Sequence, residues 1–175
     1  ARRRGPDAPP ARRGLVMPMV RVAGGIGRAP TAMAAYAAAL ADANLHNCNL
    51  VAVSSGIPAD ATIDVVDRVP DLGPAGNRLT VVEGRSVVGP DDPADTAATA
   101  IAWATGPGPG LFYEASGTDA DVVDSEARHG LDAGCELREW TFTERDAVVT
   151  AVDADGGGYT AAVVLAAYGD SEPIS

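Results

Sequence analysis

Residues 98–105 alternate between two kinds of side chain, and this alternation limits the fold more than any other feature of the chain. Successive side chains of a β-strand point to opposite faces, so a period of two predicts a strand here, even though alanine favours helices. A face of bare alanine methyl groups indicates that another element packs closely against it. The larger face carries Thr99, Ile101, Trp103 and Thr105, and the other carries Ala98, Ala100, Ala102 and Ala104.

The rest of the chain predicts mixed α and β structure with mostly antiparallel connections and two main helices. Thr118 or Asp119 is expected to cap the second helix. The glycine-rich segment 24–27 is expected to be a loop, but it lacks a dinucleotide-binding motif because Pro30 replaces the third glycine. Further strands are expected at 20–23, 49–53 (buried), 62–66, 79–88, 111–115, 147–152 and 160–168, and helices at 31–43 and 120–134.

The charged residues exclude some chemistry. The chain has 13 basic residues, all of them arginine, against 24 acidic ones, for a net charge of −11. Without lysine it has neither a Schiff-base lysine nor a P-loop lysine. An acidic surface argues against nucleic acid as a partner. Many carboxylates without lysine also keep a surface hydrated in molar salt, so we expect adaptation to high salt.

The first residues differ from the rest in charge. Arginines outnumber acids by five to one over residues 1–16, in a segment rich in proline and glycine without apolar periodicity. We expect residues 1–18 to be a basic, disordered tail, or to precede a natural start at Met17 or Met19. Residues 19–175 are expected to form one domain. No apolar segment of adequate length follows the arginines, so a signal peptide is not expected.

The remaining polar residues predict neither a metal site nor a secreted fold. His46 and His129 lie on different predicted elements and have no ligand spacing. Cys48 and Cys135 fit neither a disulfide framework nor a metal site, which favours a reducing cytoplasm. No apolar run is long enough to cross a membrane, so we expect no membrane partner.

The segment from Asn47 to Pro58 carries the strongest functional signal. By itself it could be a strand that ends in a Ser/Gly/Pro turn. Adjacent serines in a strained turn also offer another chemistry, since a serine hydroxyl can attack the preceding carbonyl to form an ester. Elimination then cuts the chain and leaves a pyruvoyl group, which gives a protein without lysine a carbonyl electrophile of its own.

Residues 19–172 resemble the pyruvoyl-dependent arginine decarboxylases. The resemblance is carried by the strand and glycine-rich segment at 20–27, the helix with Tyr36 and Leu40, and the small-residue strand at the end. Its most specific motifs are Asn47-x-Asn49-Leu50, Ser54-Ser55 followed by Ile57-Pro58, and the segment from Gly110 to Glu114.

The resemblance implies an α/β (α+β) fold, a layered αββα-type sandwich of mainly antiparallel sheet with two main helices, assembled as a homotrimer. It implies self-cleavage between Ser54 and Ser55, a covalent pyruvoyl group derived from Ser55, and conversion of arginine to agmatine and CO₂ for polyamine synthesis. Glu114 is then the expected general acid. Asn49 would orient the Ser54–Ser55 carbonyl or the pyruvoyl amide, and Ser54 would line the substrate pocket. The alanine-faced strand would suit a subunit interface.

The chain departs from the family pattern at three positions. Ala37 stands where the family places an aspartate that contacts the guanidinium of the substrate. Arginine specificity would then require Asp42 or a neighbour's carboxylate in its place. Gly56 replaces a bulky apolar residue beside the cleavage site, and Cys48 replaces an aromatic or aliphatic one. Two alternatives therefore stay open: a pyruvoyl decarboxylase of another amino acid, and an uncut paralogue that acts as a non-catalytic trimer subunit.

Overall fold

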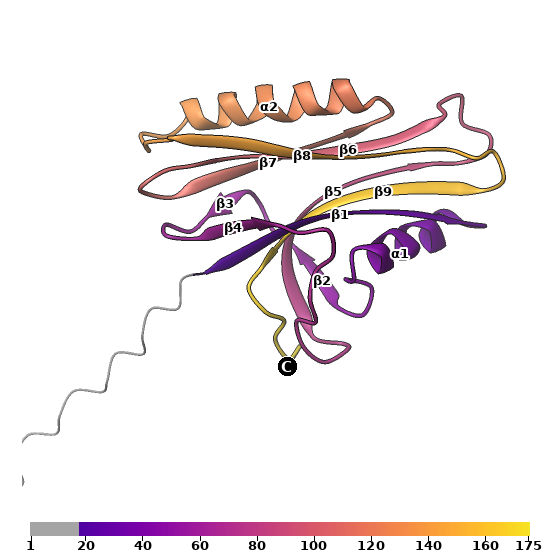
Figure 1. Cartoon of the computed structure of the whole chain (residues 1–175), viewed down its shortest axis with the longest axis horizontal. Helices are drawn as coiled ribbons and strands as arrows, with labels where there is room; N and C mark the ends of the chain where they lie inside the picture. The colour runs from indigo at the N-terminus through magenta and orange to yellow at the C-terminus, as the bar shows by residue number, and fades with distance from the viewer. Residues whose placement is uncertain (1–17) are drawn as a thin grey trace, which may run out of the picture.

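Two sheets lie between two helices in the computed structural model, which describes residues 18–175 (Figure 1). The tail predicted for residues 1–18 lies outside the described residues, apart from Pro18. In chain order the elements are β1 Met19–Ala29, α1 Ala32–Asp42, β2 Asn49–Ala52, β3 Gly56–Ile57, β4 Thr62–Val65, β5 Arg78–Val88, β6 Thr96–Thr105, β7 Gly110–Gly117, α2 Ala120–Glu136, β8 Glu144–Asp153 and β9 Tyr159–Tyr168.

The layers run α2, four-stranded sheet, five-stranded sheet, α1 (Figure 1). The four-stranded sheet has the order β3-β7-β6-β8 and is antiparallel throughout. The five-stranded sheet has the order β2-β5-β9-β1-β4, with parallel pairing only where β2 meets β5 and β4 meets β1. This αββα sandwich confirms the predicted α/β (α+β) fold class.

Strand β6 is buried on both faces, and its two faces contact different layers. Ile101 and Trp103 pack between the sheets, together with Phe112. The alanine face packs against α2, whose contacting residues include Leu131. The predicted strand and the close packing on its alanines are confirmed. The prediction that this face suits a subunit interface is wrong, because a helix of the same chain already covers it.

The glycines at 24–27 belong to β1 and do not form the expected loop. Glycine is needed here because helix α1 packs directly on the strand. A Cβ atom at Gly25 would overlap the Ala39 carbonyl oxygen, and one at Gly27 would overlap the Ala39 nitrogen. The pattern that looked like a turn is therefore a site of close helix–strand packing.

Strand β2 was predicted to be buried, but three of its four residues are exposed. It lies at the edge of the five-stranded sheet and pairs with β5 alone. An apolar run such as 49–53 cannot distinguish a central strand from an edge strand whose apolar side chains remain in solvent. The two residues of β3 were not predicted, because so short a strand has no detectable period.

Candidate functional site

Ser54 and Ser55 lie where the chain crosses from one sheet to the other. The Val53 amide still donates to the Val81 carbonyl of the five-stranded sheet at 2.9 Å. Two residues later, the Ser55 carbonyl accepts a 2.7 Å hydrogen bond from the Phe112 amide of the four-stranded sheet. The Ser54–Ser55 bond therefore joins the two sheets, at the edge formed by β2 and β3.

The backbone after this bond is held from both sheets. Phe112 on β7 binds the Ser55 carbonyl, and Tyr168 at the end of β9 donates its hydroxyl to the Gly56 carbonyl at 2.7 Å. The rings of Phe112 and Tyr168 meet edge to face, with centroids 6.2 Å apart. Ser55 is half-buried and Ser54 is exposed. Two consecutive carbonyls are thus fixed immediately after the predicted cleavage point.

Glu114 lies on the same strand as Phe112, two residues further along, so both side chains point to the same face. A Cβ atom built at Gly84 of β5 would lie 3.5 Å from the Glu114 Cβ, which places Glu114 against the five-stranded sheet. Glu114 reaches solvent, but the protein removes part of its hydration, and this desolvation raises the pKa of its carboxyl group. The charge of Glu114 in turn contributes to the raised pKa of Tyr168.

Asn49 begins β2 and faces the loop that precedes β5. Its Nδ2 donates to the Gly76 carbonyl at 2.6 Å, and the Gly76 amide donates to the Asn47 carbonyl at 2.8 Å. Asn49 therefore ties this loop to the start of the strand that leads to Ser54. Its expected contact with the Ser54–Ser55 carbonyl or the pyruvoyl amide stays a prediction.

A carboxylate that the sequence analysis did not single out lies on the α1 side of β5. The side chain of Glu83 is only 13% exposed, and the Tyr36 hydroxyl lies 2.8 Å from both of its oxygens. The Arg85 Nε lies 4.0 Å from the Glu83 Oε1, and the Arg85 guanidinium stacks on the Tyr36 ring with its Cζ 4.7 Å from the ring centroid. Burial, with the bond to Glu83 next, raises the pKa of Tyr36 to about 12. Glu83 is thus already paired.

Ala37 is exposed on α1, next to Tyr36. Asp42, the substitute considered for a carboxylate at position 37, is at the end of the same helix. One of its carboxylate oxygens accepts the Ile26 amide of β1 at 2.9 Å. Gly56 has no atom within 4 Å of the position that a Cβ would occupy, so a larger side chain fits there.

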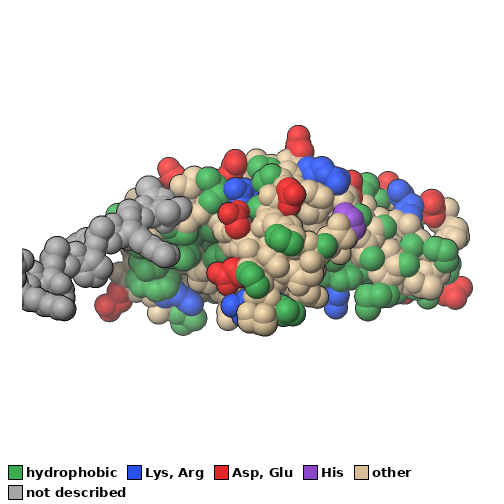
Figure 2. Space-filling model, turned by 90° about the horizontal axis from the view of Figure 1, so that it is seen from below, with side chains coloured by type: hydrophobic (Ala, Val, Ile, Leu, Met, Phe, Trp, Pro, Cys, Tyr) green, Lys and Arg blue, Asp and Glu red, His purple; other side chains and the backbone are tan. Residues whose placement is uncertain are grey.

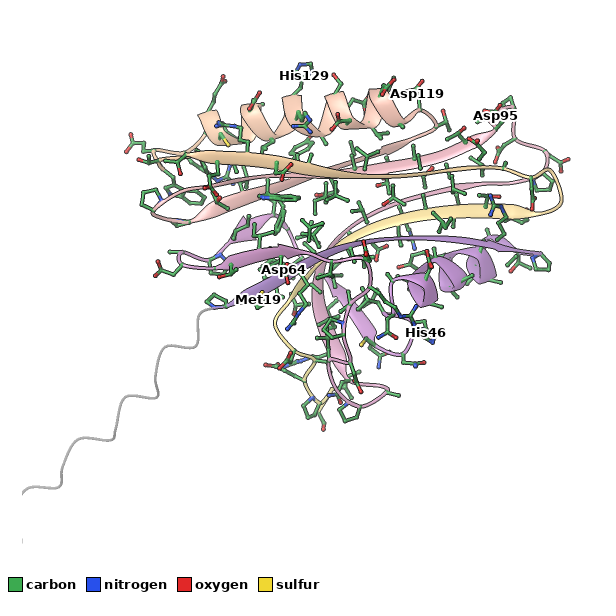
Figure 3. All side chains as sticks on the ribbon, viewed as in Figure 1. Met19, His46, Asp64, Asp95, Asp119 and His129 are labelled. Atoms are coloured by element: carbon green, nitrogen blue, oxygen red, sulfur yellow. The ribbon has the colours of Figure 1, made fainter. Side chains whose placement is uncertain are left out.

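The two histidines lie on opposite layers of the molecule, His129 on α2 and His46 in the segment after α1 (Figure 3). Within residues 18–175, no group of three or more His, Cys, Asp and Glu side chains is placed to hold a metal ion. Cys48 and Cys135 are free thiols, and burial is the main cause that raises the pKa of each. No helix in this described part is long and apolar enough to cross a membrane.

Glu114 also lines an open pocket of about 510 Å³ at the edge of β7, together with residues of α2 that include His129. A larger pocket of about 760 Å³ lies at the opposite edge, between β4 and the start of β8. Another, of about 600 Å³, lies beside Cys48. The pocket beside Glu114 is also lined by Tyr113 and Ala115, so it lies on the α2 side of β7, opposite to the face that Glu114 shares with Phe112.

Two contributors to the site were missed from the sequence. The Phe112 amide is a backbone group, and no sequence pattern marks which carbonyl it will bind. Tyr168 ends a strand of small apolar residues and reaches Gly56 only after β9 has taken its central place in the five-stranded sheet. Neither had a local signal that could have identified it.

Comparisons with known proteins show what this chain is similar to. A family described as pyruvoyl-dependent arginine decarboxylase matches residues 19–173. Proteins named pyruvoyl-dependent arginine decarboxylase from two strains of Halobacterium salinarum are each 54% identical to this chain over 161 residues, which covers 90% of this chain and 98% of the relative.

Proposed function

We propose a mechanism for this chain from the premise that it belongs to the pyruvoyl-dependent arginine decarboxylase family. Its reaction is the decarboxylation of arginine, which yields agmatine and CO₂. The family match and both relatives name arginine. They support neither decarboxylation of another amino acid nor an uncut paralogue. The similarity to Halobacterium proteins also agrees with the high-salt adaptation expected from the acidic composition.

The observation that carries the proposal is that the peptide bond between Ser54 and Ser55 joins the two sheets. Its residues fit a self-cleaving serine: Ser55 provides a hydroxyl next to the Ser54 carbonyl, and its own carbonyl is held by Phe112 at 2.7 Å. A peptide that must span two fixed sheets has little freedom to move away from its own nucleophile. We therefore assign cleavage to the Ser54–Ser55 bond, which yields residues 1–54 and 55–175.

The cleavage balances without an oxidant. The Ser55 Oγ attacks the Ser54 carbonyl carbon, the peptide C–N bond breaks, and the freed amine keeps the hydroxyl proton, which leaves an ester. Loss of the Ser55 α-proton then breaks the Cβ–Oγ bond and releases Ser54 as a new carboxylate. One water enters the remaining dehydroalanine and one ammonia leaves, so that a ketone stands at the new N-terminus.

When present, this ketone and its neighbouring amide carbonyl draw electrons from a bound amino acid as CO₂ leaves. The backbone amide of Phe112 assists, because it donates to the Ser55 carbonyl, the oxygen on which negative charge would gather. Ser54, exposed at the new chain end, lines the substrate pocket. Asn49 supports the same segment by tying β2 to the loop at Gly76.

Glu114 is the proton donor in this proposal. After CO₂ leaves, the α-carbon needs a proton, and a carboxyl group is an efficient donor when its pKa is raised toward the working pH. Desolvation shifts the pKa of Glu114 in that direction. Its strand, β7, also carries the amide that holds Ser55, so donor and reaction centre are fixed by one rigid element.

The homotrimer expected for the family needs an apolar surface, and the α1 side of the molecule offers one. Helix α1 has no charged residue before Asp42, and its Met33 is 72% exposed. On the β2 edge, Val51 and Val53 are 45% and 44% exposed. Figure 2 views the molecule from this side and shows apolar side chains exposed among acidic ones. We place the contact with a second subunit here.

Recognition of the guanidinium requires a carboxylate that Ala37 does not provide. Glu83 is paired with Tyr36 and Arg85, and Asp42 has one oxygen on the Ile26 amide. We therefore propose that a carboxylate of a neighbouring subunit contacts the guanidinium across the α1 interface. The two free thiols, Cys48 and Cys135, favour a cytoplasmic location for this assembly.

The test is cleavage followed by product release, both measured in high salt. Intact mass should show two pieces divided between Ser54 and Ser55, and the protein should release CO₂ from arginine but not from a panel of neutral amino acids. Ser55→Ala should remain one uncut, inactive chain. Ser125→Ala, an exposed serine on α2, is the control and should behave as the wild type. A wild-type chain that stays uncut after prolonged incubation would contradict the proposal.

A further inference from the structure

We propose that Tyr168 is a positioning residue for self-cleavage: its hydroxyl holds the Gly56 carbonyl and thereby fixes the backbone that carries the Ser55 nucleophile. This inference rests on the cleavage proposed above and adds a residue that the family resemblance did not supply. The bond from the Tyr168 hydroxyl to the Gly56 carbonyl is 2.7 Å long.

Tyr168 is itself held firmly. It is the last residue of β9 and pairs with Val20 of β1 in the register of the five-stranded sheet. Its ring packs edge to face on Phe112, which is fully buried and packs in the same way on Trp103. The hydroxyl therefore projects from a rigid part of the core. It connects the five-stranded sheet to β3, which belongs to the other sheet.

Gly56 depends on this contact. The residue has no side chain, and nothing lies within 4 Å of the place where a Cβ would be. Its restraints are therefore the backbone pairing with Leu111 and the Tyr168 hydroxyl. Glycine explores more backbone conformations than any other residue. Without the hydroxyl, the backbone at Gly56 would swing more freely, and the Ser55 Oγ would spend less time in line with the Ser54 carbonyl.

The hydroxyl acts as a donor and not as a base. Burial, with the nearby charge of Glu114 next, raises the pKa of Tyr168 to about 12, so the phenol keeps its proton at ordinary working pH. A donor that is always protonated is suited to hold a carbonyl in place. Because a neutral hydrogen bond contributes about 0.5–1.5 kcal/mol, its loss should slow cleavage by about twofold to about thirteenfold.

The experiment compares cleavage rates of freshly synthesised wild-type, Tyr168→Phe and Tyr159→Phe chains, by gel and intact mass in high salt. Phenylalanine keeps the ring packing on Phe112 and removes only the hydroxyl. Tyr159 begins the same strand at its far end, beside Gly89, and serves as the matched control. Thermal unfolding of each change in the uncut Ser55→Ala background reports separately on stability.

A rescue distinguishes positioning from general stability. Gly56→Ala narrows the backbone freedom of that residue without a clash, since the space is open. In the Tyr168→Phe background it should restore part of the lost cleavage rate, which a merely structural role of the hydroxyl would not produce. The expected result is slower cleavage in Tyr168→Phe, an unchanged rate in Tyr159→Phe, and recovery with Gly56→Ala.

Cleavage of Tyr168→Phe at the wild-type rate, with the wild type active, would overturn this inference alone. Slow cleavage that Gly56→Ala fails to improve would also overturn it, because the hydroxyl would then act elsewhere than on Gly56. A wild type that does not cleave would overturn the proposed function and this inference together. Cleavage of the wild-type chain therefore distinguishes failure of the proposed function from failure of this inference.

Discussion

Gly84 controls how closely the two sheets approach each other beside Glu114, and Gly84→Ala should disturb both stability and the site. An added methyl would overlap the Thr99 Oγ1, and would lie 3.3 Å from a Val164 methyl and 3.5 Å from the Glu114 Cβ. Thr99 is fully buried on β6. The Thr99 side chain must therefore rotate, or the strands must shift, to make room for the methyl.

The magnitude follows from these contacts. Overpacking of a tight core costs about 1–3 kcal/mol. The Thr99 hydroxyl donates to the Ala115 carbonyl at 3.0 Å and lies 2.9 Å from the Ser116 Oγ, so rotating it away adds the loss of about one hydrogen bond, near 1 kcal/mol. We expect Gly84→Ala to lower the free energy of unfolding by about 2–4 kcal/mol.

The assay is equilibrium urea unfolding at constant high salt and constant protein concentration in the Ser55→Ala background, where the chain stays whole. Gly108→Ala is the matched control, because nothing lies within 4 Å of its added methyl; its effect should stay within about 0.5 kcal/mol. Thr99→Ala should partly relieve the clash, so the double variant should lose less than the sum of the two single losses. Equal stability of the Gly84 and Gly108 variants, or strict additivity with Thr99→Ala, would refute the reasoning.

Two further changes test individual groups. Glu114→Gln should still self-cleave, but its kcat for CO₂ release should be about 10²–10⁴-fold lower than that of the wild type. The wild-type kcat should fall as pH rises through the raised pKa of Glu114. Glu136→Gln, on the exposed end of α2, is the control and should leave this pH profile of kcat unchanged. Tyr36→Phe should lower the free energy of unfolding at pH 7 by about 1–2 kcal/mol. This is less than the usual value of about 1.5–3 kcal/mol for a bond to a charged group, because Tyr36 is partly exposed. Since folding raises the pKa of Tyr36 from 10.0 to about 12, its stabilisation is complete below pH 10 and is lost between pH 10 and 12; a Phe variant that shows the same alkaline loss would contradict this assignment.

Local patterns predicted most of the elements because each is a direct consequence of backbone geometry. The period of two at 98–105 predicted β6, and the alanine-rich segment from Thr31 predicted α1, although Thr31 caps the helix and does not begin it. Patterns failed where a long-range neighbour decided the outcome. Residues 24–27 form a strand through pairing with β9, where glycine lets α1 pack closely, and the alanine face of β6 is covered by α2.

The sequence by itself determined the chemistry that this chain can offer: no lysine, an acidic surface, and adjacent serines in a motif that resembles one family. Those properties belong to residue types and short spacings, which survive without a fold. Only the tertiary structure decided that Ser54–Ser55 joins the two sheets, that Phe112 and Tyr168 hold the backbone beside it, and that the charge of Glu114 acts on Tyr168. Strands far apart in the chain become neighbours through sheet pairing, and no local pattern encodes which side chains then meet.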